Sequence, residues 1–137
     1  MPQYYFADHF LKQLKPHAKK FRKLPQDLTL VLKNFLPEQA QMLGQKLYKL
    51  RLKASDLPKG KSKSFRVIIY IWQDPEIVVP IAIYFKSDIQ NLSAKEIKYH
   101  LGKVLVEIET KTLDWISSSG RQNIDLSQFI RDDRQRH

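Results

Sequence analysis

The stretch from Lys59 to Asp88, KGKSKSFRVIIYIWQDPEIVVPIAIYFKSD, joins a loop of alternating cations to two runs of strand-forming residues. Because β-branched and aromatic residues favour extended structure, we expect strands over residues 65–72 and 77–86 with a short turn between them. Pro80 cannot donate a ladder hydrogen bond, so the second strand needs a sheet edge or a bulge at that point. The stretch predicts a sheet with a strongly cationic end.

The positive charge of the chain is unevenly distributed. The 137 residues carry a net charge of +10, and residues 1–66 alone hold 15 lysines and arginines against 4 acids, a net of +11. Such a field favours a polyanionic partner, either nucleic acid or an acidic protein. A membrane surface is disfavoured, because no amphipathic helix carries these cations opposite an apolar face. The absence of cysteine excludes disulfides, thiolate zinc sites and thiol nucleophiles.

Two helices are expected before the strands. Apolar residues at helical spacing predict a helix over residues 7–22, which Pro16 should kink or divide: Phe6, Phe10, Leu14, Ala18 and Phe21. Pro25 suits the first turn of a second helix, which Pro37 ends. The buried stripe of this second helix is expected to consist of Leu28, Val31, Leu32 and Phe35.

After the second helix, the spacing of apolar residues changes from a helical period to every second residue. Apolar residues at 48, 50, 52 and 54 alternate with Lys49, Arg51 and Lys53, which is typical of a strand. Three cations about 7 Å apart on one strand face match the spacing of successive phosphates, although a solvated sheet face would carry the same pattern.

The last predicted element is a C-terminal helix. Ser93 and Glu96 form a capping-box pattern, and an apolar stripe then predicts a helix of about 15–20 residues: Ile97, Leu101, Val104, Leu105 and Ile108. We expect one domain over residues 1–115 and a partly flexible extension over residues 116–137. The sequence shows neither a signal peptide nor a membrane span, so we expect a cytoplasmic protein.

Strand parity indicates where the cations would meet. Arg66 alternates with the apolar positions 65, 67, 69 and 71, and Tyr84 and Lys86 alternate with Ile81, Ile83 and Phe85. If helices cover the more apolar face, a phosphate cradle would form on the other face from Lys49, Arg51, Arg66, Tyr84 and Lys86. This depends on strand order, which the sequence leaves open.

Other chemistries find little support. The four histidines have no zinc-ligand spacing, the four glycines are isolated, and no pair of carboxylates lies near the basic strands. We therefore expect no metal and no cofactor, and any RNA cleavage should be metal-free.

The order of these segments resembles a known family. Two helices, then LGQKLYKLRLKASDLPKGKSKSFRVIIYI, then IVVPIAIYFKSD and NLSAKEI are similar to the RelE/ParE-like toxins of bacterial toxin–antitoxin operons, in particular the RelE/HigB-type branch. The resemblance covers roughly residues 4–100 and rests on Y-K-x-R-L, G-K-S-x-x-[FY]-R-V and I-Y-x-K-S-D. It implies an α+β fold: a small twisted antiparallel sheet, two N-terminal helices packed on one face, and a C-terminal helix.

The resemblance also implies site residues. Lys49 and Arg51 would lie on the phosphate-holding strand, Arg66 would be the family's central arginine, and Lys86 would close the third core strand. The catalytic set would then be Arg66, Lys86, Tyr84 and Arg51, with RNA contacts from Lys49, Lys53, Lys61 and Lys63. The proton-transfer group stays open between Tyr84, Tyr99 and His100.

The function implied is that of an mRNA interferase. It would cut mRNA on the ribosome by attack of the RNA 2′-hydroxyl on the adjacent phosphorus, giving a 2′,3′-cyclic phosphate, and a cognate antitoxin protein would silence it. Two alternatives remain: a non-enzymatic toxin that binds a protein target, as gyrase inhibitors of the ParE branch do, and a basic nucleic-acid-binding module without chemistry.

Overall fold

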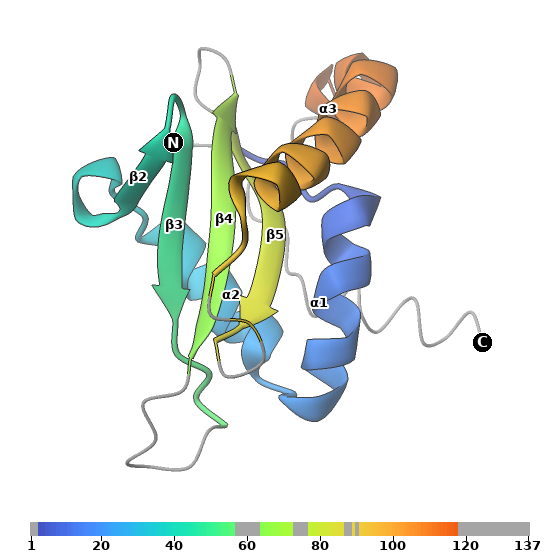
Figure 1. Cartoon of the computed structure of the whole chain (residues 1–137). Helices are drawn as coiled ribbons and strands as arrows, with labels where there is room; N and C mark the ends of the chain where they lie inside the picture. The colour runs from blue at the N-terminus through green and yellow to red at the C-terminus, as the bar shows by residue number, and fades with distance from the viewer. Residues whose placement is uncertain (1–2, 57–63, 73–76, 87–88, 90, 118–137) are drawn as a thin grey trace.

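The computed structural model describes residues 3–56, 64–72, 77–86, 89 and 91–117. They form an α+β fold in which one five-stranded sheet is combined with three α-helices (Figure 1). The predicted fold class is confirmed. Among the described helices, none has the length and apolar character needed to cross a membrane.

The sheet has the strand order β1-β5-β4-β3-β2. Its strands are β1 (Gln3–Tyr4), β2 (Gln41–Gly44), β3 (Leu47–Leu52), β4 (Phe65–Trp72) and β5 (Ile77–Phe85). Neighbours from β2 to β5 pair antiparallel, as expected, and β1 adds one parallel pairing with β5, so the sheet is mixed. The short β1 reaches the far edge before the helices begin, and the local sequence does not indicate which strand it pairs with.

The helices are α1 (Asp8–Lys20), α2 (Leu24–Lys33) and α3 (Ala94–Ser117), with a short 3-10 helix, η1 (Pro37–Gln39), after α2. Helix α1 continues through Pro16, contrary to the expected division. Pro16 is exposed, so the carbonyl that loses its helical donor can be hydrated. Pro25 lies in the first turn of α2, as predicted.

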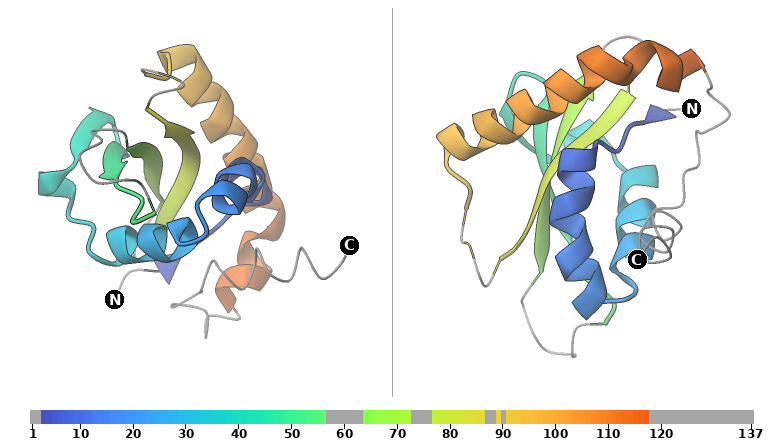
Figure 2. Two further views of the ribbon diagram at one scale, coloured as in Figure 1. Left: turned by 90° about the horizontal axis from the view of Figure 1, so that it is seen from below. Right: turned by 90° about the vertical axis from the view of Figure 1, so that its right-hand side faces the viewer.

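Both faces of the sheet are covered, as the edge-on view in Figure 2 shows. Helices α1 and α2 pack on one face through Phe10, Leu14 and Leu28, against alternate residues of β3 and β4. Helix α3 packs on the other through Val104 and Ile108. The predicted parity of β3 and β4 is confirmed, because residues 65, 67, 69 and 71 all face α1 and α2.

Helix α3 begins at the predicted capping box. The Ser93 N–H donates to Glu96 Oε1 at 3.1 Å, and the Glu96 N–H donates to Ser93 Oγ at 3.1 Å. The backbone and side-chain hydrogen bonds of Ser93 are the main cause that lowers the pKa of Glu96. The helix has 24 residues, more than the 15–20 expected.

A bulge interrupts the pairing of β4 with β5. Ile68 pairs with Ala82 and Ile69 with Pro80, which leaves Ile81 as an extra residue. The bulge expected at Pro80 is therefore confirmed. The predicted parity of Ile81 was wrong, however, because the extra residue turns it toward α3 together with Ala82.

Strand β2 was not predicted. Its sequence QMLG lacks β-branched residues, and it forms by pairing with β3 across a tight turn in which Lys46 has a φ of 64°. The Lys46 carbonyl also accepts the N–H of Ile71 at 2.9 Å, which fixes this turn beside β4.

Candidate nucleic-acid site

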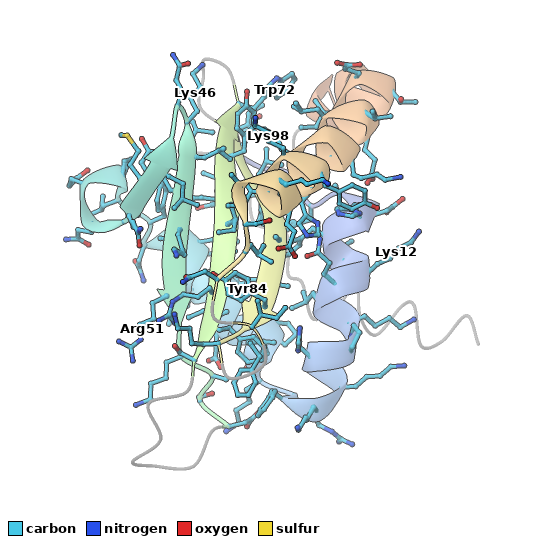
Figure 3. All side chains as sticks on the ribbon, in the orientation of Figure 1. Lys12, Lys46, Arg51, Trp72, Tyr84 and Lys98 are labelled. Carbon is cyan, nitrogen blue, oxygen red and sulfur yellow. The ribbon has the colours of Figure 1, made fainter. Side chains whose placement is uncertain are left out.

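Three of the predicted site residues form a row across the sheet. Arg51 of β3 pairs with Arg66 of β4, and Arg66 pairs with Tyr84 of β5. Figure 3 shows Arg51 and Tyr84 at the same end of the sheet, next to the end of β3. Register thus brings together side chains that lie 15 and 18 positions apart in the sequence.

The Arg66 guanidinium is held by its own strand. Its Nη1 donates to the Ser64 hydroxyl and to the Phe65 carbonyl, the latter at 3.3 Å. Ser64 is 1% exposed, and its carbonyl accepts the N–H of Lys86 at 2.8 Å. No described carboxylate forms an ion pair with Arg66, and the Asp56 carboxylate instead accepts the N–H of Lys23 at 2.8 Å.

Lys49 lies beside this row. Its Nζ donates to Asn91 Oδ1 at 3.1 Å. Partial burial lowers the pKa of Lys49, and the charges of Lys86 and Arg66 lower it further. The three cations are therefore close enough to repel one another, which is the arrangement an anion would relieve.

Tyr84 contributes a buried phenol. Its side chain is 4% exposed, and its hydroxyl has no hydrogen-bond partner within the described residues, although the Leu92 backbone lies beside it. Burial raises the pKa of Tyr84, while the Arg66 charge and the Leu92 backbone oppose that rise. At neutral pH the hydroxyl keeps its proton and can donate a hydrogen bond.

Of the three candidates for proton transfer, Tyr84 alone is placed beside Arg66 by strand register. Tyr99 and His100 lie on α3, where their ring contacts are with each other and with His9. Arg51 and Lys53 are exposed near the end of β3. Lys61 and Lys63 lie outside the described residues.

The sheet face that carries these groups is more covered by helix than the alternation of residues along the strands had suggested. Helix α3 crosses it over the end of β4 and the start of β5, so the basic groups lie at the opposite end of the sheet (Figure 1). Sequence reasoning missed Ser64 and Asn91, which hold Arg66 and Lys49. Ser64 directly precedes the F-R-V motif, but nothing in the sequence links Asn91 to Lys49. In the described part of the chain, no group of His, Asp or Glu side chains is suited to hold a metal ion.

Comparison with known proteins gives a likeness to solved structures and no family. No family model matches the chain, and no curated protein matches it. Among solved structures, the chain is similar to a mutant of the Escherichia coli toxin RelE in the free state, with 16% identity and a TM-score of 0.47. The match covers 78% of this chain and 97% of that one.

Proposed function

We propose that this protein is the toxin of a toxin–antitoxin pair and that it cuts mRNA on the ribosome without a metal ion. The observation that carries the proposal is the pairing of Arg51 with Arg66 beside a buried phenol. Like charges placed directly opposite each other destabilise a sheet. A pair with that cost is expected where an anion binds, and the sequence resemblance implies that this anion is an RNA phosphate.

The residues suit a reaction that builds charge on phosphorus-bound oxygens. The RNA 2′-oxygen attacks the adjacent phosphorus and the 5′-oxygen leaves, which gives a 2′,3′-cyclic phosphate and a 5′-hydroxyl. The Arg66 fork would bind two phosphoryl oxygens, and Lys49 and Lys86 would add charge around them. Preorganised donors of this kind stabilise the transition state more than the ground state.

Tyr84 would act as a donor in this scheme. Because burial raises the pKa of its hydroxyl, the phenol would stay protonated and be a poor base, and it would donate its proton to the leaving 5′-oxygen. The lowered pKa of Lys49 favours its neutral form, so this lysine would be the better candidate to accept the proton of the 2′-hydroxyl, and it would then carry its charge beside the phosphate.

The test is cleavage of mRNA on programmed ribosomes by Arg66→Ala and Arg66→Lys proteins. Loss of one transition-state contact should cost roughly 10²–10³ in rate for Arg66→Ala. Arg66→Lys should recover part of that loss, because the charge returns without the fork. Both proteins should keep the melting temperature of the wild type within a few degrees, since Arg66 makes no described ion pair.

The matched control is Arg22→Ala, an exposed arginine in the turn between α1 and α2. It removes the same charge from a different part of the surface and should leave cleavage unchanged. Full cleavage by a well-folded Arg66→Ala protein would remove the basis of the proposed site. Primer extension on the same reactions distinguishes codon-phased cuts from the absence of cuts that a gyrase-type inhibitor or a plain binding module would give.

A further inference from the structure

A second cluster of charged and aromatic groups lies away from the Arg66 row. An open pocket of about 750 Å³ separates the first turns of α1 from the outer face of α3. Its lining comes from these two helices alone: Asp8, His9, Lys12, Lys98, Tyr99, Gly102, Lys103, Val106 and Glu107. Figure 3 shows Lys12 on α1 and Lys98 on α3. Neither Arg66 nor Tyr84 lines this pocket.

Tyr99 provides an exposed aromatic surface in the pocket. Its side chain is 58% exposed, and its ring makes T-shaped contacts with His9 and His100 at centroid distances of 6.0 and 5.5 Å. A Cβ added at Gly102, within one helical turn of Tyr99, would have no atom within 4 Å, so there is open space beside the ring. The ring is therefore held in place while much of its surface stays accessible.

The charges around Tyr99 favour an anion. Lys12, Lys98 and Lys103 line the pocket from two helices, and Lys103 Nζ lies 5.7 Å from the Tyr99 ring centroid. The Glu107 carboxylate is already engaged, because its two oxygens accept the N–H groups of Asp8 and His9 at 2.7 and 2.9 Å. Glu107 thus serves to cap helix α1.

A histidine pair forms part of the same site. His9 Nε2 lies 2.8 Å from His100 Nδ1, a distance at which the two rings share one proton. Burial is the main cause that lowers the pKa of both histidines. The neutral form of the pair is therefore favoured at pH 7, and a bound anion would raise the pKa of both histidines.

We propose that the α1–α3 pocket binds one nucleotide of a single-stranded nucleic acid, with the base stacked on Tyr99 and the phosphate held by Lys12, Lys98 and Lys103. An exposed aromatic ring among cations is the arrangement that stacks a base and binds its phosphate. A pocket of this volume is large enough for a nucleotide. An acidic peptide would satisfy the lysines but would give the ring no stacking partner. The inference does not depend on the proposed RNA cleavage.

The experiment follows the Gly102 amide signal of the full-length protein in two-dimensional NMR titrations. The two probes are adenosine 5′-monophosphate and ribose 5-phosphate, which differ only in the base. Because stacking on one aromatic side chain is expected to contribute roughly 5- to 150-fold in affinity, the nucleotide should bind more tightly by that factor. Tyr99→Leu should abolish the difference, whereas Tyr99→Phe, which keeps the ring, should retain it.

Two further measurements complete the test. Lys12→Ala should weaken both probes to a similar degree and should reduce the salt dependence of binding. Equal affinity for the two probes would overturn the proposal, because it would indicate a phosphate site without stacking. A hexaglutamate peptide that shifts the Gly102 signal when the nucleotide does not would overturn it in favour of an acidic protein partner. Cleavage is not measured, so failure here is distinguishable from failure of the proposed function.

Discussion

Gln13 offers a direct test of how the bulge in β5 is stabilised. In the described part of the chain, β1 pairs with Ile77 and Val78, and no described strand lies along the outer edge of β5 beyond that point. The Gln13 side chain of α1 hydrogen-bonds to the backbone of this edge. Its Nε2 donates to the Ile81 carbonyl at 3.0 Å, and its Oε1 accepts the Ile83 N–H at 3.3 Å. One amide side chain thus replaces part of a missing strand.

Gln13→Ala should leave two buried backbone groups without partners. Ile81 and Ile83 are 0% and 4% exposed, so water has little access to the groups that lose a hydrogen bond. At about 1–3 kcal/mol for each unsatisfied group, the free energy of unfolding should fall by about 2–6 kcal/mol. For a chain of this size, that corresponds to a melting temperature lower by roughly 7–21 °C.

Urea unfolding followed by circular dichroism gives the free energy, and a thermal melt gives the temperature. Lys19→Ala, an exposed change on the same helix, is the control and should shift stability by less than about 0.5 kcal/mol. If Gln13→Ala proves as stable as this control, then the edge of β5 is satisfied by something other than Gln13, and the reasoning fails.

Two other predictions concern Tyr84 and the histidine pair. Tyr84→Phe removes a buried hydroxyl that has no described partner. The protein should therefore be as stable as the wild type or more stable by about 1 kcal/mol, while mRNA cleavage should fall roughly 10²-fold. A destabilised variant with full cleavage would contradict this prediction. Because the pKa values of His9 and His100 are lowered from 6.5 in the folded protein, the unfolded chain binds more protons below pH 6.5. The free energy of unfolding should therefore decrease as the pH falls below 6.5, and His100→Gln should flatten this dependence in urea titrations at pH 5 to 7.5; an unchanged slope would refute it.

Much of the fold is local enough to be predicted from the sequence. The bounds of β4 follow from a run of alternating strand formers that ends at a polar turn, and α3 begins where Ser93 and Glu96 cap it. Strand β2 was harder to predict, because its sequence QMLG has no β-branched residue and takes its extended form from pairing with β3 across a tight turn. The parallel pairing of β1 with β5 is non-local, so the residues of β1 do not indicate which strand it joins.

The site was predictable in part for the same reason. Alternation fixes the face on which Arg66 lies, and pairing then places Arg51 opposite it. The neighbours that hold these side chains come from outside the strands. Asn91 lies in the connection that follows β5, and its contact with Lys49 depends on the path of that connection across the sheet. Local sequence does not encode such a path.

The bulge at Pro80 determines where Tyr84 lies. Counted from Ile77, strict alternation along β5 would place Tyr84 on the face covered by α1 and α2, because Ile77 and Val79 face α3. The extra residue at Ile81 reverses the parity, so Tyr84 faces the same side as Arg66. A proline that cannot complete the ladder favours that irregularity. The fold thus uses a backbone defect, supported from α1, to bring a phenol to the basic row.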